Sequence, residues 1–262
     1  GNKPDRVMET ASGLLNSIGL QNPGAHSVIN DYLPKLDMSQ SQFIINVSGS
    51  SIEEYAEIVR LFDQTSLPAM EINISCPNVK KGGAAFGNDP DMAARVVEAC
   101  RASTTKPLIV KLSPNQTDIA EGARRVIEAG ADALSAINTM MGMQIDIHSR
   151  TPTLGNNQGG LSGPAIKPIA LLKVHQVYQV AKLHNIPIIG LGGIASAEDA
   201  IEFFLAGASM VAIGTAIAKD PLLVKKVNAG IEQYLKANGL TSVSQLTGQL
   251  ALNTDTVLCG SV

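Results

Sequence analysis

The chain has 262 residues, of which 45% are hydrophobic and only 3% aromatic, and its formal net charge at pH 7 is −3. This length and composition predict one large domain with an aliphatic core. The charges form no basic stripe, no apolar run is long enough to cross a membrane, and no signal peptide opens the sequence. We therefore expect a cytoplasmic protein that binds neither nucleic acid nor membranes.

The cysteines bear on the cellular compartment and on metal binding. Cys76, Cys100 and Cys259 are odd in number and widely spaced, which favours a reducing compartment over a disulfide framework. The chain has no CxxC pair, and its four histidines are scattered. The sequence therefore predicts no metal site, and no iron–sulfur cluster or structural zinc held by the cysteines of this chain alone.

The first forty residues are loop-like, with one short helical stretch from Ser27 to Leu33. Six later runs are predicted to be strands. They are nearly all apolar, a pattern typical of a parallel sheet that is covered on both faces. These runs are Phe43–Val47, Ala69–Ser75, Leu108–Leu112, Ala133–Asn138, Ile186–Leu191 and Met210–Gly214.

Helical segments separate the six runs, and their starts at Ser51, Asp89, Thr117-Asp118 and Ser196 carry capping and acidic residues. This alternation predicts an α/β fold, a (β/α)8 TIM barrel, with residues 1–262 forming one domain. Because such a barrel closes with eight strands, we expect the first two strands to be missing from this chain, leaving the domain incomplete at its N-terminus. An open or differently closed sheet is the alternative.

Polar groups follow the carboxyl ends of the predicted strands, the edge at which barrel enzymes carry their sites. They are Asn46, Asn73 with Cys76 and Asn78, Lys111, Asn138 with Thr139, Gly192-Gly193, and Gly214-Thr215. A thiol can accept a proton, and amides can hold a planar polar ring because they both donate and accept hydrogen bonds. The structural alternatives are an inert buried thiol, asparagines that only hold loops, and an ion pair for the lysine.

Glycines after the last two strands precede helical segments. Gly192-Gly193 and Gly214-Thr215 therefore predict a phosphate site built from backbone N–H groups near helix N-termini, with tight turns as the alternative. Gly190-x-Gly192-x-x-Ala195 also fits a dinucleotide-binding fingerprint. No acidic residue follows about twenty positions on, so we reject a dinucleotide site here.

Six motifs stand in a characteristic order along the chain. They are Leu15–Gly24, Asn73–Asn78, Val110–Asn115, Ile137–Thr139, Gly160–Ala165 and Gly190–Gly193. From Gly1 to about Leu246 the chain resembles the class 1 dihydroorotate dehydrogenases. Glu9-Thr10, Gln21–Gly24 and Met140–Pro152 are most similar to the NAD-linked subclass, class 1B. The stretch Gln249–Val262 matches no part of the family pattern.

The resemblance implies an FMN-containing barrel that oxidises (S)-dihydroorotate to orotate in pyrimidine (UMP) biosynthesis. Cys76 would be the base that removes a proton from the carbon beside the substrate carbonyl, while hydride passes to FMN. Lys111 would be the second catalytic residue, stabilising negative charge on the flavin. The implied substrate-binding residues are Asn16, Ile18, Gly19, Leu20, Asn73, Asn78, Asn138 and Thr139. The implied cofactor-binding residues are Asn46, Asn73, Lys111, Ile137, Gly163, Gly192, Gly193, Gly214 and Thr215.

A partner is also implied. Class 1B enzymes pass electrons to NAD through a separate subunit that carries FAD and a [2Fe-2S] cluster, bound to a homodimeric core in a heterotetramer. In that family, further flavin contacts and a second lysine near the substrate come from the region that this chain lacks. The alternatives are a fumarate-linked class 1A enzyme, a flavin module like that of dihydropyrimidine dehydrogenase, and a non-catalytic, truncated barrel.

Overall fold

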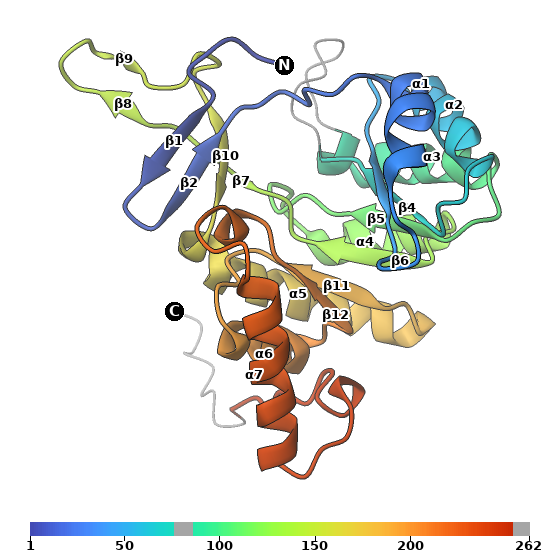
Figure 1. Cartoon of the computed structure of the whole chain (residues 1–262), viewed down its shortest axis with the longest axis vertical. Coiled ribbons are helices and arrows are strands. Elements are labelled where there is room, and N and C mark those ends of the chain that lie inside the picture. The colour runs from blue at the N-terminus through green and yellow to red at the C-terminus, as the bar shows by residue number, and fades with distance from the viewer. Residues whose placement is uncertain (76–85, 254–262) are drawn as a thin grey trace, which may run out of the picture.

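Six parallel strands form the main sheet of the computed structural model, which describes residues 1–75 and 86–253 (Figure 1). The strand order is β12-β11-β6-β5-β4-β3. The strands are β3 (Ile45–Val47), β4 (Met70–Asn73), β5 (Leu108–Lys111), β6 (Ala133–Ala136), β11 (Ile188–Leu191) and β12 (Met210–Ala212). Each lies within a run predicted from the sequence, so the predicted parallel α/β architecture is confirmed.

Helices connect successive strands, as expected for right-handed crossovers between parallel strands. They are α2 (Ile52–Asp63), α3 (Pro90–Arg101), α4 (Ile119–Glu128), α5 (Lys167–Ala181) and α6 (Ala197–Ala206), and α7 (Leu223–Ala237) follows the last strand. The predicted helix starts are confirmed. Ser51, Asp89, Asp118 and Ser196 are N-caps whose side chains accept hydrogen bonds from backbone N–H groups of the first turn. None of the helices among the described residues has the length and apolar character needed to span a bilayer.

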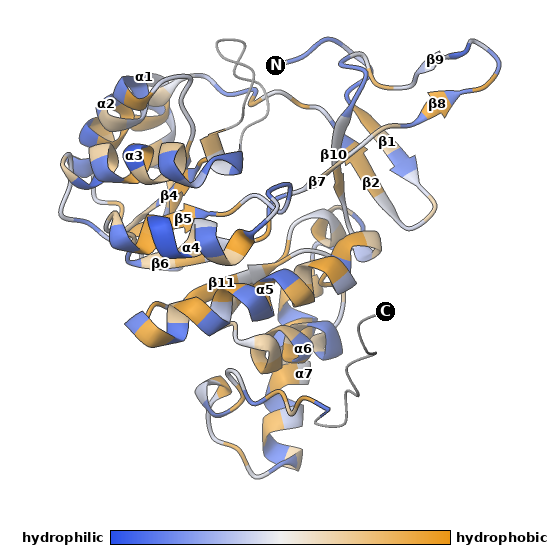
Figure 2. Cartoon of the chain, turned by 180° about the vertical axis from the view of Figure 1, so that it is seen from behind, coloured by the Kyte–Doolittle hydropathy of each residue, from blue (hydrophilic) through white to orange (hydrophobic). Residues whose placement is uncertain are grey.

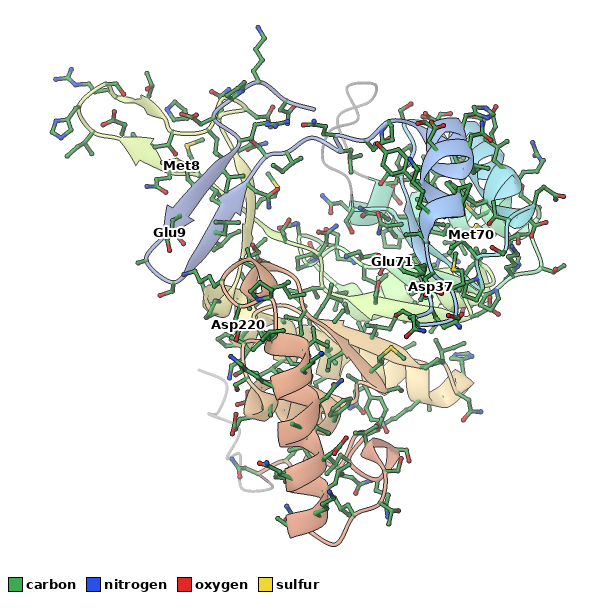
Figure 3. The ribbon with its side chains drawn as sticks, in the orientation of Figure 1. Met8, Glu9, Asp37, Met70, Glu71 and Asp220 are labelled. Carbon is green, nitrogen blue, oxygen red and sulfur yellow. The ribbon has the colours of Figure 1, made fainter. Side chains whose placement is uncertain are left out.

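The two faces of the main sheet differ in their surroundings. Met70 and Ile72 of β4 are fully buried on the face that packs against the helices, and Figure 2 shows these strands as mainly hydrophobic. Glu71, between them, points to the opposite face, as Figure 3 shows. That inner face also carries Lys111 and Met210, and Met210 is 60% exposed. The inner face is thus polar and partly open within the described chain.

A second, antiparallel sheet has the order β1-β2-β10-β7. Its strands are β1 (Val7–Thr10), β2 (Gly13–Asn16), β7 (Met140–Gly142) and β10 (Gly159–Ser162), and a hairpin of β8 (Ile145–Asp146) and β9 (Thr151–Pro152) extends beside it (Figure 1). The prediction that the first forty residues are loop-like, with a helical stretch alone, was therefore wrong for β1 and β2. These strands are only four residues long, too short to show a clear apolar pattern, and β2 pairs with β10 from far along the chain.

The predicted helical stretch near Ser27 is confirmed. It consists of α1 (Ala25–Ser27), a π-helical turn over Val28–Tyr32 and a 3-10 turn over Leu33–Lys35. Further 3-10 turns occupy Phe86–Asn88, Pro164–Ile166, Lys182–His184, Thr215–Ala218 and Val243–Gln245.

Cys100 lies on α3 inside the hydrophobic core, with no exposed surface. Burial raises the pKa of its thiol to about 12, so almost none of it is thiolate near neutral pH. In a variant that keeps Cys100 as its single cysteine, made by Cys76→Ser and Cys259→Ser, we expect a thiol reagent to leave the native protein unlabelled. The same reagent should label the denatured chain fully, and rapid labelling of the native protein would contradict this burial.

Candidate active site

The carboxyl ends of the main strands face the antiparallel sheet across a cavity of about 590 Å³. The main sheet contributes Asn73, and the segment after β6 contributes Asn138 and Thr139. The antiparallel sheet contributes Asn16 from β2 and Gly160 from β10. Every predicted substrate residue within the described part of the chain lines this cavity, namely Asn16, Ile18, Gly19, Leu20, Asn73, Asn138 and Thr139. The structure thus brings together residues that lie more than 100 positions apart in the sequence, such as Asn16 and Asn138.

Close packing between the two sheets shapes this cavity. A Cβ atom at Gly160 would lie 2.1 Å from the Thr139 hydroxyl oxygen, so glycine is needed there for β10 to approach the segment after β6. The Asn16 side-chain amide donates a hydrogen bond of 3.3 Å to the Gly160 carbonyl. Ser17, Asn156 and Gln158 also line the cavity, and the sequence did not suggest them.

Cys76 and Asn78, the predicted base and one predicted substrate ligand, lie outside the described residues. The chain that leads to them is fixed at Ser75, directly after β4. Its backbone N–H donates to the Asn73 side-chain oxygen at 3.2 Å, and its hydroxyl donates to the Lys111 carbonyl at 3.1 Å. Ser75 therefore ties the end of β4 to the end of β5.

The asparagine side chains form a connected hydrogen-bond chain. Asn138 Nδ2 donates to Asn73 Oδ1 at 3.1 Å, and Asn73 Nδ2 donates to Asn46 Oδ1 at 3.5 Å. The Asn138 oxygen in turn accepts the Thr139 N–H at 2.8 Å. The hydroxyl group of the buried Tyr55, on α2, donates a hydrogen bond to the Asn73 carbonyl at 2.7 Å. This bond holds the end of β4 against α2. The amides are thus oriented by the protein itself.

A second cavity, of about 190 Å³, adjoins the first and shares Asn138 and Thr139 with it. The predicted cofactor residues that line it are Lys111, Ile137, Gly163, Gly192, Gly193, Gly214 and Thr215. Asn46 lines neither cavity. It is exposed at β3 and acts through its hydrogen bonds with Asn73 and Glu71.

Lys111 and Glu71 form an ion pair on the inner face, with Lys111 Nζ 3.7 Å from Glu71 Oε2. Both side chains are more than four-fifths buried, at 19% and 18% exposure. Lys111 therefore has the ion pair that was the structural alternative for it, and it also lines the second cavity. Glu71 was missed from the sequence, although an acidic residue in the apolar run Ala69–Ile72, two residues before Asn73, was a usable signal.

Three glycines at the second cavity, Gly163, Gly192 and Gly193, are called the glycine segment here, and their backbone conformation requires positive φ angles. Gly163, Gly192 and Gly193 have φ of 90°, 132° and 83°, which side chains rarely tolerate. A Cβ atom on Gly193 would also lie 2.8 Å from the Gly163 carbonyl oxygen. Thr215 donates from its hydroxyl to Ser162 at 2.8 Å, which joins the segment after β12 to the end of β10.

Asp199 holds the two sides of this cavity together. The Asp199 carboxylate accepts hydrogen bonds from Lys167 Nζ at 2.6 Å and from the Ala195 N–H at 2.8 Å. The backbone N–H of Asp199 donates to the Ser196 hydroxyl, which is the N-cap of α6. Burial raises the pKa of Asp199, but the hydrogen bonds from Lys167 and Ala195 outweigh that effect and leave the pKa below its usual value. The first turn of α6 is therefore self-capped at the Asp199 N–H, as the predicted helix start at Ser196 implies.

Within residues 1–75 and 86–253, no group of three or more His, Cys, Asp or Glu side chains is placed to hold a metal ion. The chemistry available from the described residues is thus amide hydrogen bonding, one lysine cation and bare backbone.

The comparisons agree with this arrangement. The family model described as dihydroorotate dehydrogenase matches residues 1–235. A protein of Desulforamulus reducens called "Dihydroorotate dehydrogenase B (NAD(+)), catalytic subunit" is 52% identical over 249 residues, covering 95% of this chain and 81% of the relative. Proteins with the same name from Geotalea daltonii and Anoxybacillus flavithermus are 51% and 49% identical, covering 96% and 100% of this chain and 82% and 83% of the relatives. These matches confirm the resemblance to class 1B, and the chain belongs to the dihydroorotate dehydrogenase family.

Proposed function

We propose that this protein is the catalytic subunit of an NAD-linked dihydroorotate dehydrogenase, which oxidises (S)-dihydroorotate to orotate in pyrimidine biosynthesis. The observation that carries the proposal is the 590 Å³ cavity lined by Asn16, Asn73 and Asn138 at the strand ends, in a chain about half identical to enzymes of that name. These amides suit a ring that carries a carboxylate and imide groups, because each amide can donate to an acceptor oxygen.

FMN is the cofactor we propose for the second cavity. The residues fit it because Gly192, Gly193 and Gly214 line the cavity with bare backbone, and because Lys111 places a cation on its wall. Gly163, Gly193 and Thr215 would hold the phosphate and ribityl chain, and Ile137 would pack near the ring. Bound FMN supplies a two-electron acceptor for the hydride of the substrate.

The self-capped start of α6 refines this assignment. The N–H groups of Ala195 and Asp199 are already taken by side chains of the same turn. These two N–H groups are therefore not available to a phosphate, and we propose the glycine segment as its main donor. Lys167 does not serve as a free cation for it, since it is paired with Asp199 and Glu202.

Cys76 is proposed as the base. It follows Ser75 in the sequence, and Ser75 lines the asparagine-lined cavity. An ordinary thiol has a pKa of about 8.5, so only a fraction of Cys76 is thiolate at neutral pH unless its surroundings lower that value. Once ionised, its sulfur would take the proton from the substrate carbon beside the carbonyl, with the amides holding the ring in place.

The main sheet is proposed to be part of an eight-stranded barrel. Its edge strands β3 and β12, its polar inner face and the 60% exposure of Met210 all fit a sheet that curves around further chain. The relatives are longer, since this chain covers 81–83% of their length. A homodimeric core and a second subunit carrying FAD and a [2Fe-2S] cluster complete the proposal, because the relatives are named as catalytic subunits.

Flavin reduction tests the proposed activity. Adding dihydroorotate to the FMN-loaded chain without oxygen should bleach the visible flavin absorption, and NAD reduction should require the partner subunit. An FMN-loaded chain that is not reduced by dihydroorotate would contradict the proposal. Efficient fumarate reduction by this chain alone would favour the class 1A alternative.

Replacing Gly193 with alanine is expected to weaken FMN binding by about tenfold or more. The positive φ angle and the contact with the Gly163 carbonyl would force the glycine segment to move. Gly239→Ala is the matched control, because Gly239 has a φ of 66° but no atom within 4 Å of an added Cβ. Fluorescence titration of FMN measures the effect. Equal losses in the two variants would show that backbone strain, and not the cavity, is responsible.

A further inference from the structure

Glu71 is the buried acidic group that the proposed reaction does not use. It lies on the inner face of β4, opposite Met70, as Figure 3 shows. Its Oε1 accepts the Ser135 hydroxyl at 2.6 Å, and its Oε2 accepts a hydrogen bond from Asn46 Nδ2. Lys111 Nζ lies 3.7 Å from the same Oε2. A carboxylate that is 18% exposed and has three partners on three neighbouring strands is held in one place.

A carboxylate can accept hydrogen bonds but cannot donate them, and this property fixes its neighbours. Asn46 must turn its NH₂ group toward Glu71, so its oxygen faces Asn73. Asn73 then donates its own NH₂ group to that oxygen at 3.5 Å. Because Glu71 stands at the end of the chain, it determines which way round the Asn46 amide lies.

At the other end of this hydrogen-bond chain, backbone N–H groups fix the amides in the same donor direction. Asn73 Oδ1 accepts from Ser75 N–H and from Asn138 Nδ2, and Asn138 Oδ1 accepts from Thr139 N–H. The donors therefore run in one direction, from Asn138 to Asn73 to Asn46 and finally to Glu71. Asn73 and Asn138 use their oxygens within the protein and each keep one N–H that can donate to an acceptor group of a ligand in the cavity.

We propose that Glu71 is a positioning residue that fixes the donor direction of the Asn46–Asn73–Asn138 chain and holds the Lys111 ammonium at the wall of the second cavity. The site thereby selects planar ligands with an edge of acceptor oxygens, such as a ring carboxylate with an adjacent carbonyl. This inference rests on the proposed function, since it concerns how the same site recognises orotate.

Glu71→Gln provides the test, because glutamine keeps the shape but brings a donor and loses the charge. The FMN-loaded 262-residue chain is titrated with orotate and with uracil, which lacks the carboxylate. We expect orotate binding to weaken by about 10- to 100-fold, as for loss of hydrogen bonds to a charged group, and uracil binding to weaken less. Glu232→Gln, on the exposed side of α7, is the matched control and should bind orotate like the unmodified chain.

A rescue variant separates donor direction from general damage. In the double variant Glu71→Gln with Asn46→Asp, the carboxylate moves one step along the chain and accepts from both Gln at 71 and Asn73. We expect this variant to regain most of the lost orotate affinity. Thermal denaturation should give similar midpoints for both variants. An orotate affinity in Glu71→Gln equal to that of the unmodified chain, or a double variant no better than the single one, would overturn the inference.

The same titration distinguishes this inference from the proposed function. If the unmodified FMN-loaded chain binds no orotate, the proposed function fails and the positioning role fails with it. If the unmodified chain binds orotate and Glu71→Gln binds it equally well, the proposed function stands and the positioning role alone is wrong.

Discussion

Cys76→Ser is expected to lower the rate of dihydroorotate oxidation by about 10²–10⁴-fold, the usual contribution of a positioned general base. A serine hydroxyl holds its proton far more strongly than a thiol does, so it cannot accept the substrate proton at neutral pH. Orotate binding should change little, because the amides of Asn16, Asn73 and Asn138 remain. The rate of anaerobic flavin reduction by dihydroorotate, measured by stopped flow, reports the loss.

The pH dependence makes this prediction specific to a base. In the unmodified chain the reduction rate should rise with pH as the thiol ionises and then level off above its pKa. In Cys76→Ser that rise should shift to higher pH. Cys100→Ala is the control, because Cys100 lies in the core of α3 and contributes no accessible thiolate. Unchanged turnover in Cys76→Ser would remove Cys76 from the mechanism.

Lys111→Met is expected to reduce the flavin-reduction rate by about 10²–10³-fold, in line with removal of one preorganised charge from a site where negative charge develops. FMN affinity should fall as well, because the variant leaves the Glu71 carboxylate largely buried without its cation. FMN titration and single-turnover reduction measure the two effects separately. Lys225→Met, on the exposed face of α7, is the matched control.

Combining Lys111→Met with Glu71→Gln separates these two causes. Removal of the unpaired carboxylate should restore part of the FMN affinity but none of the reduction rate, since the cation is still absent. If Lys111→Met reduces its flavin as fast as the unmodified chain, Lys111 serves only as the partner of Glu71.

The parallel sheet could be predicted from the sequence because its strands lie in mainly apolar runs. Four of them, β3, β4, β5 and β11, are also followed by a helix with a side-chain N-cap. The residues of the candidate site were visible for a related reason, since amides and a lysine stand where apolar runs end. Asn73 and Lys111 are register partners at the ends of β4 and β5, so their proximity follows from the strand alignment.

Other features depend on pairings that local sequence does not encode. β1 and β2 are only four residues long, and β2 finds its second partner only when β10 is placed beside it. Asp199 looks like an ordinary residue of the first turn of a helix, and only the fold reveals that it joins Lys167 to the glycine segment. The orientation of the Asn46 amide likewise depends on Glu71 from the next strand.

The antiparallel sheet has a consequence for how the protein is made. Asn16 of β2 and Gly160 of β10 are hydrogen-bonded neighbours in the wall of the first cavity, yet they are 144 residues apart in the chain. During synthesis β1 and β2 emerge early and can form only a two-stranded hairpin, which is marginally stable by itself. The cavity therefore cannot close until β10 has left the ribosome, and closing such a long loop makes this a late step in folding. A ligand that bridges the two sheets would bind only after that step, and it would stabilise the contact that the chain makes last.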